Sequence, residues 1–291
     1  MSSTPSFGRC PGRRCDSLGL LALVVLLSGC GETPAQSERV ATSAAAAVKV
    51  PGYLEPAERP DSVALLPPPP ARGSAEYRSD EDIYRRLSAL AGTARWRLAA
   101  ADADLKFPHV ANVFACALGI NVDATRTPHL YTLLQRTIID AGQSTYPAKL
   151  KYGTSRPFED TGDPTCVPED ESALRGNASY PSGHASLGYV WGEVLAQVLP
   201  DRAPALRARG YEFGQSRVIC RVHRQSDVDA GRMVGQAVMP RLQLDPEFQA
   251  DLAAARIEAQ QASKRPVAPV RDCSAEAAAL SAATAPTAAG P

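Results

Sequence analysis

Helical periodicity is the feature that most restricts what this chain can fold into. Six successive segments carry helix signals, and in one of them Leu130, Leu133, Leu134 and Ile138 recur at helical spacing. Runs of alternating β-branched residues, which predict strands, are absent. We therefore predict an all-α, single-domain helical bundle. The predicted helices cover 79–101, a segment opening at Asp123 or Thr127, 181–199, 204–222, 226–242 and 246–262.

The first 29 residues are not expected to belong to the fold. Three arginines precede a short apolar run over 18–27, which ends in Leu27-Ser28-Gly29-Cys30. A basic leader, a short apolar core and small residues describe a secretory signal, and the run is short for a membrane span. The ending resembles a bacterial lipobox, which implies that Cys30 becomes the lipidated first residue. An ordinary signal peptide, or a short anchor with a chance cysteine, is the alternative.

Localisation and charge follow from this leader. Gly31, rather than an aspartate, follows the lipobox cysteine, so the analogy favours the outer membrane. We expect an outer-membrane-anchored lipoprotein on the periplasmic side, or a secreted periplasmic protein. The chain has 31 basic and 31 acidic side chains, and removal of 1–29 takes away three arginines and one aspartate, leaving a net charge of −2. This balance argues against nucleic-acid binding. No later segment approaches 18 uninterrupted apolar residues, so we expect a water-soluble domain on a tether.

Composition divides the mature chain into three parts. Residues 30–51 are rich in Ala, Ser and Thr and are predicted to form a flexible tether. Residues 52–263 are long enough to bury one core and form the predicted domain. Residues 264–291 return to Ala, Pro and Thr, and we predict that they are largely disordered, although Cys273 could hold part of them.

Four cysteines remain in the predicted domain and its tail. They are Cys116, Cys166, Cys220 and Cys273. In an oxidising compartment an even number predicts up to two disulfides, with three possible pairings. A four-cysteine metal site is the alternative, but no paired CxxC spacing supports it.

One histidine stands at a predicted helix entry. His184 ends the run Ser179-Tyr180-Pro181-Ser182-Gly183-His184, directly before an apolar helix. The free backbone N–H groups of such an entry suit an anion. A helix cap with a surface histidine is the simpler interpretation of this motif on its own.

A second histidine has a carboxylate four residues later. The spacing of His223 and Asp227 predicts that both lie on one helix face, where the carboxylate can orient the imidazole. Arg217 precedes His223 by about two helical turns and is expected near the same face. A structural His–Asp pair is the simpler alternative. An arginine facing such a pair suggests an oxyanion ligand.

A third motif supplies cations. Lys149, Lys151 and Arg156 lie within one short stretch that ends at Pro157. Taken alone, this stretch has the composition of a solvated charge run.

In chain order, the three motifs resemble a known signature. They are similar to the phosphatase signature of the type 2 phosphatidic acid phosphatase superfamily and the vanadium haloperoxidases. The three parts are Lys149-x6-Arg156-Pro157, Pro181-Ser182-Gly183-His184 and Ser216-Arg217-x5-His223-x3-Asp227. The closer resemblance, over about 52–260, is to class A bacterial non-specific acid phosphatases. It includes Val110-Ala111-Asn112, Ile139-Asp140-Ala141-Gly142, 210–220 and 225–230.

This resemblance implies a mechanism. Lys149, Arg156, Ser182, Gly183 and Arg217 would bind phosphate. His223 would be the nucleophile, oriented by Asp227, and His184 the general acid. The family's chemistry needs no metal and no other cofactor, so we expect a metal-independent acid phosphatase that forms a phosphohistidine. The substrates implied are phosphate monoesters, broadly and including nucleotides, and the family suggests a homo-oligomer.

Departures from the family pattern leave substrate preference open. The family usually has a small residue at Arg221, an aromatic residue at Val222 and often tryptophan at Arg224. Arg221 and Arg224 are therefore expected to add charge beside the nucleophile. The alternatives are a lipid phosphatase at the membrane, a vanadate-dependent haloperoxidase, or an inactive surface lipoprotein that binds phosphate.

Overall fold

The computed structural model describes residues 50–284, which contain helices and no strand. The prediction of an all-α fold is confirmed. The leader, Cys30 and most of the predicted tether lie outside the described residues. Within the described part, no helix is both long and apolar enough to cross a membrane.

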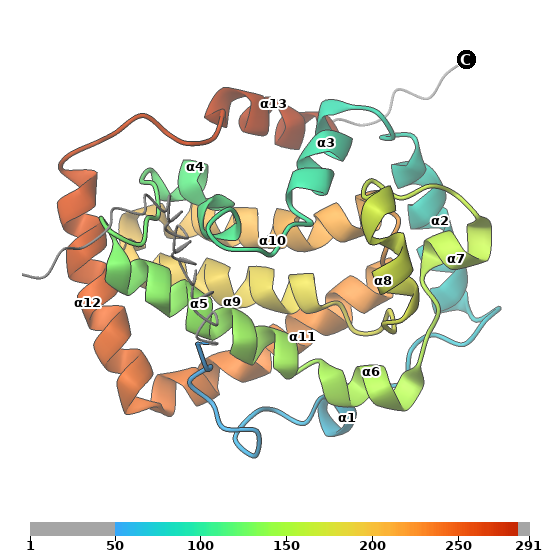
Figure 1. Cartoon of the computed structure of the whole chain (residues 1–291). Coiled ribbons are helices and arrows are strands. Elements are labelled where there is room, and N and C mark those ends of the chain that lie inside the picture. The colour runs from blue at the N-terminus through green and yellow to red at the C-terminus, as the bar shows by residue number, and fades with distance from the viewer. Residues whose placement is uncertain (1–49, 285–291) are drawn as a thin grey trace, which may run out of the picture. The chain divides into compact units, whose positions relative to one another are not determined.

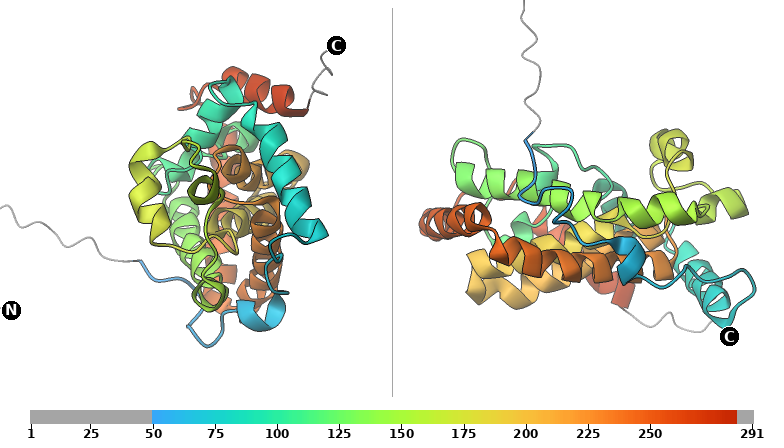
Figure 2. Two further views of the ribbon diagram at one scale, coloured as in Figure 1. Left: turned by 90° about the vertical axis from the view of Figure 1, so that its right-hand side faces the viewer. Right: turned by 90° about the horizontal axis from the view of Figure 1, so that it is seen from below.

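Five long helices form the core of the bundle (Figures 1 and 2). Helix α9 lies in the middle and packs against the other four. Its side chains are buried on nearly all sides, and the indole N–H of Trp191 on α9 donates to Thr137 Oγ1 on α5 at 3.0 Å. The five helices are α5 (Pro128–Gln143), α9 (Gly183–Val198), α10 (Ala203–Ile219), α11 (Gln225–Leu244) and α12 (Pro246–Ser263).

Glycines allow α9 and α10 to approach each other closely. A Cβ on Gly188 of α9 would collide with the carbonyl oxygen of Gly210, and a Cβ on Gly210 of α10 would collide with that of Gly188. The two backbones are therefore in direct contact at this crossing. The crossing fixes the start of α9 relative to the end of α10.

Shorter helices surround this core. They are α1 (Ser62–Leu65), α2 (Ala75–Ser88), α3 (Ala94–Ala101), η1 (Val110–Asn112), α4 (Ala115–Leu118), α6 (Tyr146–Tyr152), α7 (Pro157–Thr161), η2 (Pro168–Asp170), α8 (Glu171–Arg175) and η3 (Pro200–Arg202). Most span only one or two turns, too short for apolar periodicity to reveal them in the sequence.

The single helix predicted over 79–101 is wrong. The chain forms α2 and α3 instead, with a break between them. Gly92 in the break has φ +76°, in the left-handed region, and Thr93 caps α3 by accepting a hydrogen bond from the Trp96 N–H. A left-handed glycine in the turn after α2, followed directly by the threonine that caps α3, accounts for the break.

Part of the tail that was predicted to be largely disordered is ordered, from Cys273 to Thr284. These residues form α13 (Cys273–Thr284), which packs against α3 (Figure 1). A disulfide joins Cys116 to Cys273, and the side chain of Ala279 is buried. Residues 285–291 lie outside the described part of the chain.

The second disulfide joins Cys166 to Cys220. Of the three pairings open at the sequence level, the structure thus has Cys116–Cys273 with Cys166–Cys220. Cys220 directly follows α10, so this bridge attaches the loop before η2 to the end of α10. Both elements adjoin the pocket described next.

Candidate active site

The three sequence motifs meet at one pocket of about 360 Å³. Its lining includes six predicted residues, Lys149, Arg156, Gly183, His184, Arg217 and His223. They come from α6, the start of α7, the start of α9, the end of α10 and the turn after α10. Ser182 and Asp227 lie just behind this lining.

The N-terminus of α9 forms one wall. Ser182 is the N-cap and is fully buried, and its Oγ accepts a hydrogen bond of 3.4 Å from the Ala185 N–H. Its own N–H donates to the Asp227 carbonyl at 2.8 Å. The structure therefore gives the Ser182 side chain a capping contact, whereas Gly183 is the residue that reaches the pocket. The first N–H groups of α9 are aimed at any anion bound there.

Three cations face the pocket although they are almost fully buried. Lys149 Nζ donates to the Ala178 carbonyl at 2.5 Å, and Arg156 Nε donates to the Leu174 carbonyl at 3.0 Å. Arg217 is 2% exposed, and its Nε and Nη1 have no hydrogen-bond partner in the described structure. Buried guanidinium N–H groups without partners are costly, and a phosphate oxygen would satisfy them.

Burial lowers the pKa of each cation, and repulsion from Arg156 adds to this effect for Lys149 and Arg217. The pKa of Lys149 falls to about 7, that of Arg156 to about 10 and that of Arg217 to about 9. The arginines stay protonated at neutral pH. Lys149 loses its charge as the pH rises through about 7. The full positive charge of the pocket is therefore present only below neutral pH.

The spacing of His223 and Asp227 predicts that both lie on one helix. In the structure they do not, and this prediction is wrong. Helix α10 ends at Ile219, Arg221 has φ +66°, and His223 lies in the turn before α11. The left-handed residue reverses the chain, so Arg217 and His223 face each other across a turn. The i+4 spacing still brings the groups together, because Asp227 is the third residue of α11.

The Nδ1 side of His223 is held by two residues. It lies 3.2 Å from Ser179 Oγ and 3.4 Å from Asp227 Oδ2, while Ser179 Oγ donates to the same Oδ2 at 2.6 Å. These acceptors place the ring proton on Nδ1, so Nε2 carries the lone pair and accepts from Arg156. Arg156 Nη1 lies 3.2 Å from that Nε2. Ser179 belongs to the sequence motif that ends at His184, but nothing in the sequence predicts its contact with His223.

His184 is held by the backbone. Its Nε2 lies 3.2 Å from the carbonyl oxygen of Ala103, which can only accept, so Nε2 carries the proton. Nδ1 is then the nitrogen that can exchange a proton with a bound ester. Burial, followed by repulsion from Arg217, holds the pKa of His184 well below its usual range. Burial and the repulsion of Arg156 do the same to the pKa of His223.

The two unusual arginines are directed away from the pocket. Arg221 donates to the Pro164 and Ser88 carbonyls and lies over the Trp96 ring. Arg224 pairs with Asp160 and donates to the Ser155 carbonyl. Neither lines the pocket. The charge of Arg224 nevertheless acts on the nucleophile, because it adds to the effect of burial in lowering the pKa of His223, as expected from the sequence.

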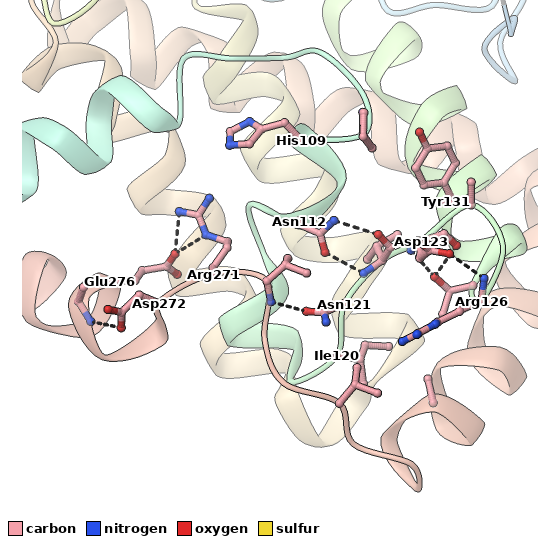
Figure 3. Close-up of a pocket in the computed structure, with 18 of the residues that line it drawn as sticks. His109, Asn112, Ile120, Asn121, Asp123, Arg126, Tyr131, Arg271, Asp272 and Glu276 are labelled. Carbon is pink, nitrogen blue, oxygen red and sulfur yellow. Dashed lines mark hydrogen bonds and ion pairs between the residues drawn. The ribbon is translucent and has the colours of Figure 1, made fainter.

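A larger cavity of about 1390 Å³ lies elsewhere, beneath the chain that leads into α13 (Figure 3). It contains His109, which pairs with Asp104 at 3.3 Å, and none of the signature residues. No group of three or more His, Cys, Asp or Glu side chains in residues 50–284 is arranged to hold a metal ion. The chemistry suited to phosphate is therefore found in the smaller pocket.

Comparison with known proteins agrees with this geometry. A model described as the PAP2 superfamily matches residues 128–242. The chain is 43% identical over 207 residues to the "Non-specific acid phosphatase" of Salmonella typhimurium, covering 71% of this chain and 83% of the relative. It is 43% identical over 207 residues to that of Providencia stuartii, covering 71% and 84%. It is 37% identical over 202 residues to the "Acid phosphatase" of Zymomonas mobilis, covering 69% and 76%.

Fold and pocket thus define a member of the PAP2 superfamily. The chain resembles the class A type over about 52–260. Within the superfamily it belongs to the non-specific acid phosphatases, and the resemblance seen in the sequence is confirmed.

Proposed function

We propose that the protein hydrolyses phosphate monoesters through a phosphohistidine on His223, without a metal ion. Family membership supports the overall reaction. The observation that supports the mechanism is the anchoring of His223 Nδ1 by Ser179 and Asp227, which leaves Nε2 beside the cations of the pocket. Phosphoryl transfer depends mainly on positioning and charge stabilisation, and this pocket supplies both.

The first step forms a bond from His223 Nε2 to phosphorus while the bond from phosphorus to the ester oxygen breaks. His184 gives its Nδ1 proton to that oxygen, and the alcohol leaves. Lys149, Arg156 and Arg217 balance the negative charge on the remaining phosphate oxygens. Asp227 stabilises the positive charge that develops on the His223 imidazole.

The second step reverses these roles. Neutral His184 removes a proton from water, whose oxygen attacks phosphorus. The bond between phosphorus and nitrogen breaks, its electron pair returns to His223, and inorganic phosphate forms. The alcohol and the phosphate account for every atom of the ester and the water.

The lowered pKa values fit these roles once substrate charge is included. His223 must be neutral to attack, and burial among cations keeps it neutral at acidic pH. His184 must be protonated, although its pKa is also lowered in the free site. A phosphate ester brings up to two negative charges beside His184, and its second pKa is near 6. Substrate binding therefore raises the pKa of His184 at the stage when the proton is needed.

The intermediate itself is the most direct test. Single-turnover reaction of His184→Ala with p-nitrophenyl phosphate, quenched without acid, should trap phosphate on His223 as an acid-labile, base-stable adduct. Activity should survive prolonged dialysis against EDTA, and vanadate should compete with substrate. An adduct on Ser182, or activity restored only by Zn²⁺ or Mg²⁺, would contradict the mechanism.

Lipidation and export form a second part of the proposal. The lipobox supports a membrane tether through Cys30, and the signal segment supports a periplasmic location. Cys30→Ser should abolish palmitate labelling and release the protein from membranes, and unchanged labelling would exclude the tether. On the family resemblance we also propose a homo-oligomer. Light scattering of the purified domain tests this, and a monomeric mass would refute it.

A further inference from the structure

Helix α13 is connected to the protein interior through a buried carboxylate. Glu276 is only 7% exposed, and its Oε1 accepts a hydrogen bond of 3.2 Å from Nε of Arg209 on α10. Its Oε2 accepts another of 3.0 Å from Nε of Arg271 (Figure 3). The disulfide between Cys273 and Cys116 attaches the first residue of α13 to α4. This helix is therefore anchored both covalently and by charge.

Arg209 carries the contact inward to Asp102, which follows α3. Arg209 Nη2 donates to Oδ1 of Asp102 at 2.5 Å, and Nη1 donates to Oδ2 at 3.2 Å. Burial acts to lower the pKa of Arg209, but Asp102 and Glu276 together raise it, so the guanidinium stays charged. Removal of one charge from such a buried triad leaves another uncompensated, which disturbs the remaining contacts.

The residue next to Asp102 contacts His184. The Ala103 carbonyl oxygen lies 3.2 Å from His184 Nε2, and it is the hydrogen-bond partner that sets the tautomer of this ring. A second contact leads to the same side chain. Arg209 lies 5.9 Å from the centroid of the Phe213 ring, whose centroid lies 5.5 Å from that of His184. Both sets of contacts from α13 thus end at His184.

We propose that α13 is a positioning element for the general acid, acting through Glu276, Arg209 and Asp102 on the carbonyl that orients His184. This inference rests on the proposed role of His184 and adds to it. The resemblance to acid phosphatases covers about 52–260 and ends before α13. In this chain, a segment outside the shared signature therefore supports a residue inside it.

The test uses the full chain with Glu276→Gln, which keeps the shape of the side chain and removes its charge. We expect kcat on an alkyl phosphate such as glycerol phosphate to fall about tenfold, because a basic leaving group depends on the general acid. Single-turnover release of p-nitrophenol should change less than about twofold, because that leaving group needs little protonation. Inhibition by inorganic phosphate should be unchanged.

Two further variants separate positioning from general damage. Asp272→Asn removes a charge from the same end of α13, at an exposed residue whose capping bonds asparagine can also make, and should alter neither activity. The double variant Cys116→Ser/Cys273→Ser releases α13 without leaving a free thiol, and should show the same selective loss on the alkyl phosphate. Thermal melts of each variant confirm that the protein is folded at the assay temperature.

A double-mutant cycle decides the question. In a His184→Ala background, Glu276→Gln should cause no further loss on the alkyl phosphate, because the group that it positions is gone. Equal losses on both esters, or a further loss in the His184→Ala background, would overturn the inference. So would the absence of any effect of both Glu276→Gln and Cys116→Ser/Cys273→Ser. If His184→Ala itself showed no dependence on the leaving group, the proposed role of His184 would fail first, independently of α13.

Discussion

The two histidines of the pocket are both buried beside cations, but they are held in different ways. His223 is held at Nδ1 by the side chains of Ser179 and Asp227. His184 is held at Nε2 by the backbone carbonyl of Ala103. A carboxylate stabilises a full positive charge better than a carbonyl does. The difference suits His223 to carry a covalent phosphoryl group, and His184 to gain and lose a proton.

Removal of each histidine in turn is the strongest test of the difference between them, and it has the largest expected effect. His223→Ala should lose at least about 10³-fold in kcat on every ester, because each turnover needs the nucleophile. His184→Ala should lose about 10²–10⁴-fold on alkyl phosphates and much less on p-nitrophenyl phosphate in single turnover. Single-turnover rates on both esters measure the contrast. Identical patterns for the two variants would show that the histidines do not divide the roles in this way.

Substitution of Asp227 or Ser179, which hold His223 Nδ1, should lower kcat less than removal of either histidine. Asp227→Asn keeps the shape but removes the charge that balances the imidazolium, and should lower kcat about 10²-fold on both esters. Ser179→Ala leaves the carboxylate in place and should cost about tenfold, equivalent to about 1.4 kcal/mol. Steady-state assays over pH 4–8 measure both variants. A larger effect for Ser179 than for Asp227 would indicate that the hydroxyl, not the carboxylate, is the main support.

The pH dependence of phosphate binding separates the contribution of the cation Lys149 from the contributions of the two histidines. Because the pKa of Lys149 is about 7, the affinity for inorganic phosphate should fall above pH 7, by up to about tenfold per pH unit. Lys149→Arg should keep its charge and move this decline to higher pH. Inhibition constants from pH 5 to 9 provide the measurement. The same decline in wild type and in Lys149→Arg would assign it to another group.

The smallest expected effect is on stability in acid. The folded-state pKa of His223 lies well below its ordinary value of 6.5, so the unfolded chain binds more protons below pH 6.5. The free energy of unfolding should therefore decrease as the pH is lowered below 6.5, by about 1 kcal/mol per pH unit from this group. Asp227, whose pKa burial raises, acts in the opposite direction.

A variant isolates this contribution of His223. In His223→Gln, the slope of unfolding free energy against pH, measured by urea denaturation from pH 5 to 6.5, should be smaller than in wild type. His129→Gln is the matched control, since His129 is exposed and lies outside the pocket. Parallel slopes in wild type and His223→Gln would show that this histidine titrates normally in the folded state.

The sequence predicted the long helices and the signature residues that meet at the pocket, because both depend on short spacings. Prolines at or near the starts of α9, α10 and α12 mark these helices in the sequence. The signature residues meet because each motif lies at a helix end. The turn that holds His223 was not predicted, since i+4 spacing is compatible with one helix face and also with a turn that precedes a helix.

Other features depend on contacts that leave no local pattern. The Ala103 carbonyl that orients His184 belongs to a residue 81 positions away, and any residue type could supply it. The partners of Arg209 lie 107 and 67 positions away, just after α3 and on α13. Composition favoured disorder for the alanine-rich tail, because one buried glutamate and one disulfide are too few to register as a pattern. Such features emerge only when the chain is folded.

The crossing of Gly188 and Gly210 has a consequence for redesign of this enzyme. Helix α9 carries His184 at its start and α10 carries Arg217 near its end, so the contact between their backbones sets the distance from acid to cation. The opposite wall of the pocket, with Ala173, Leu174 and Asn177, belongs to a short helix and the residues after it. Libraries that seek new substrates can diversify that wall freely. Any β-carbon at the crossing would change the reaction geometry for all substrates at once.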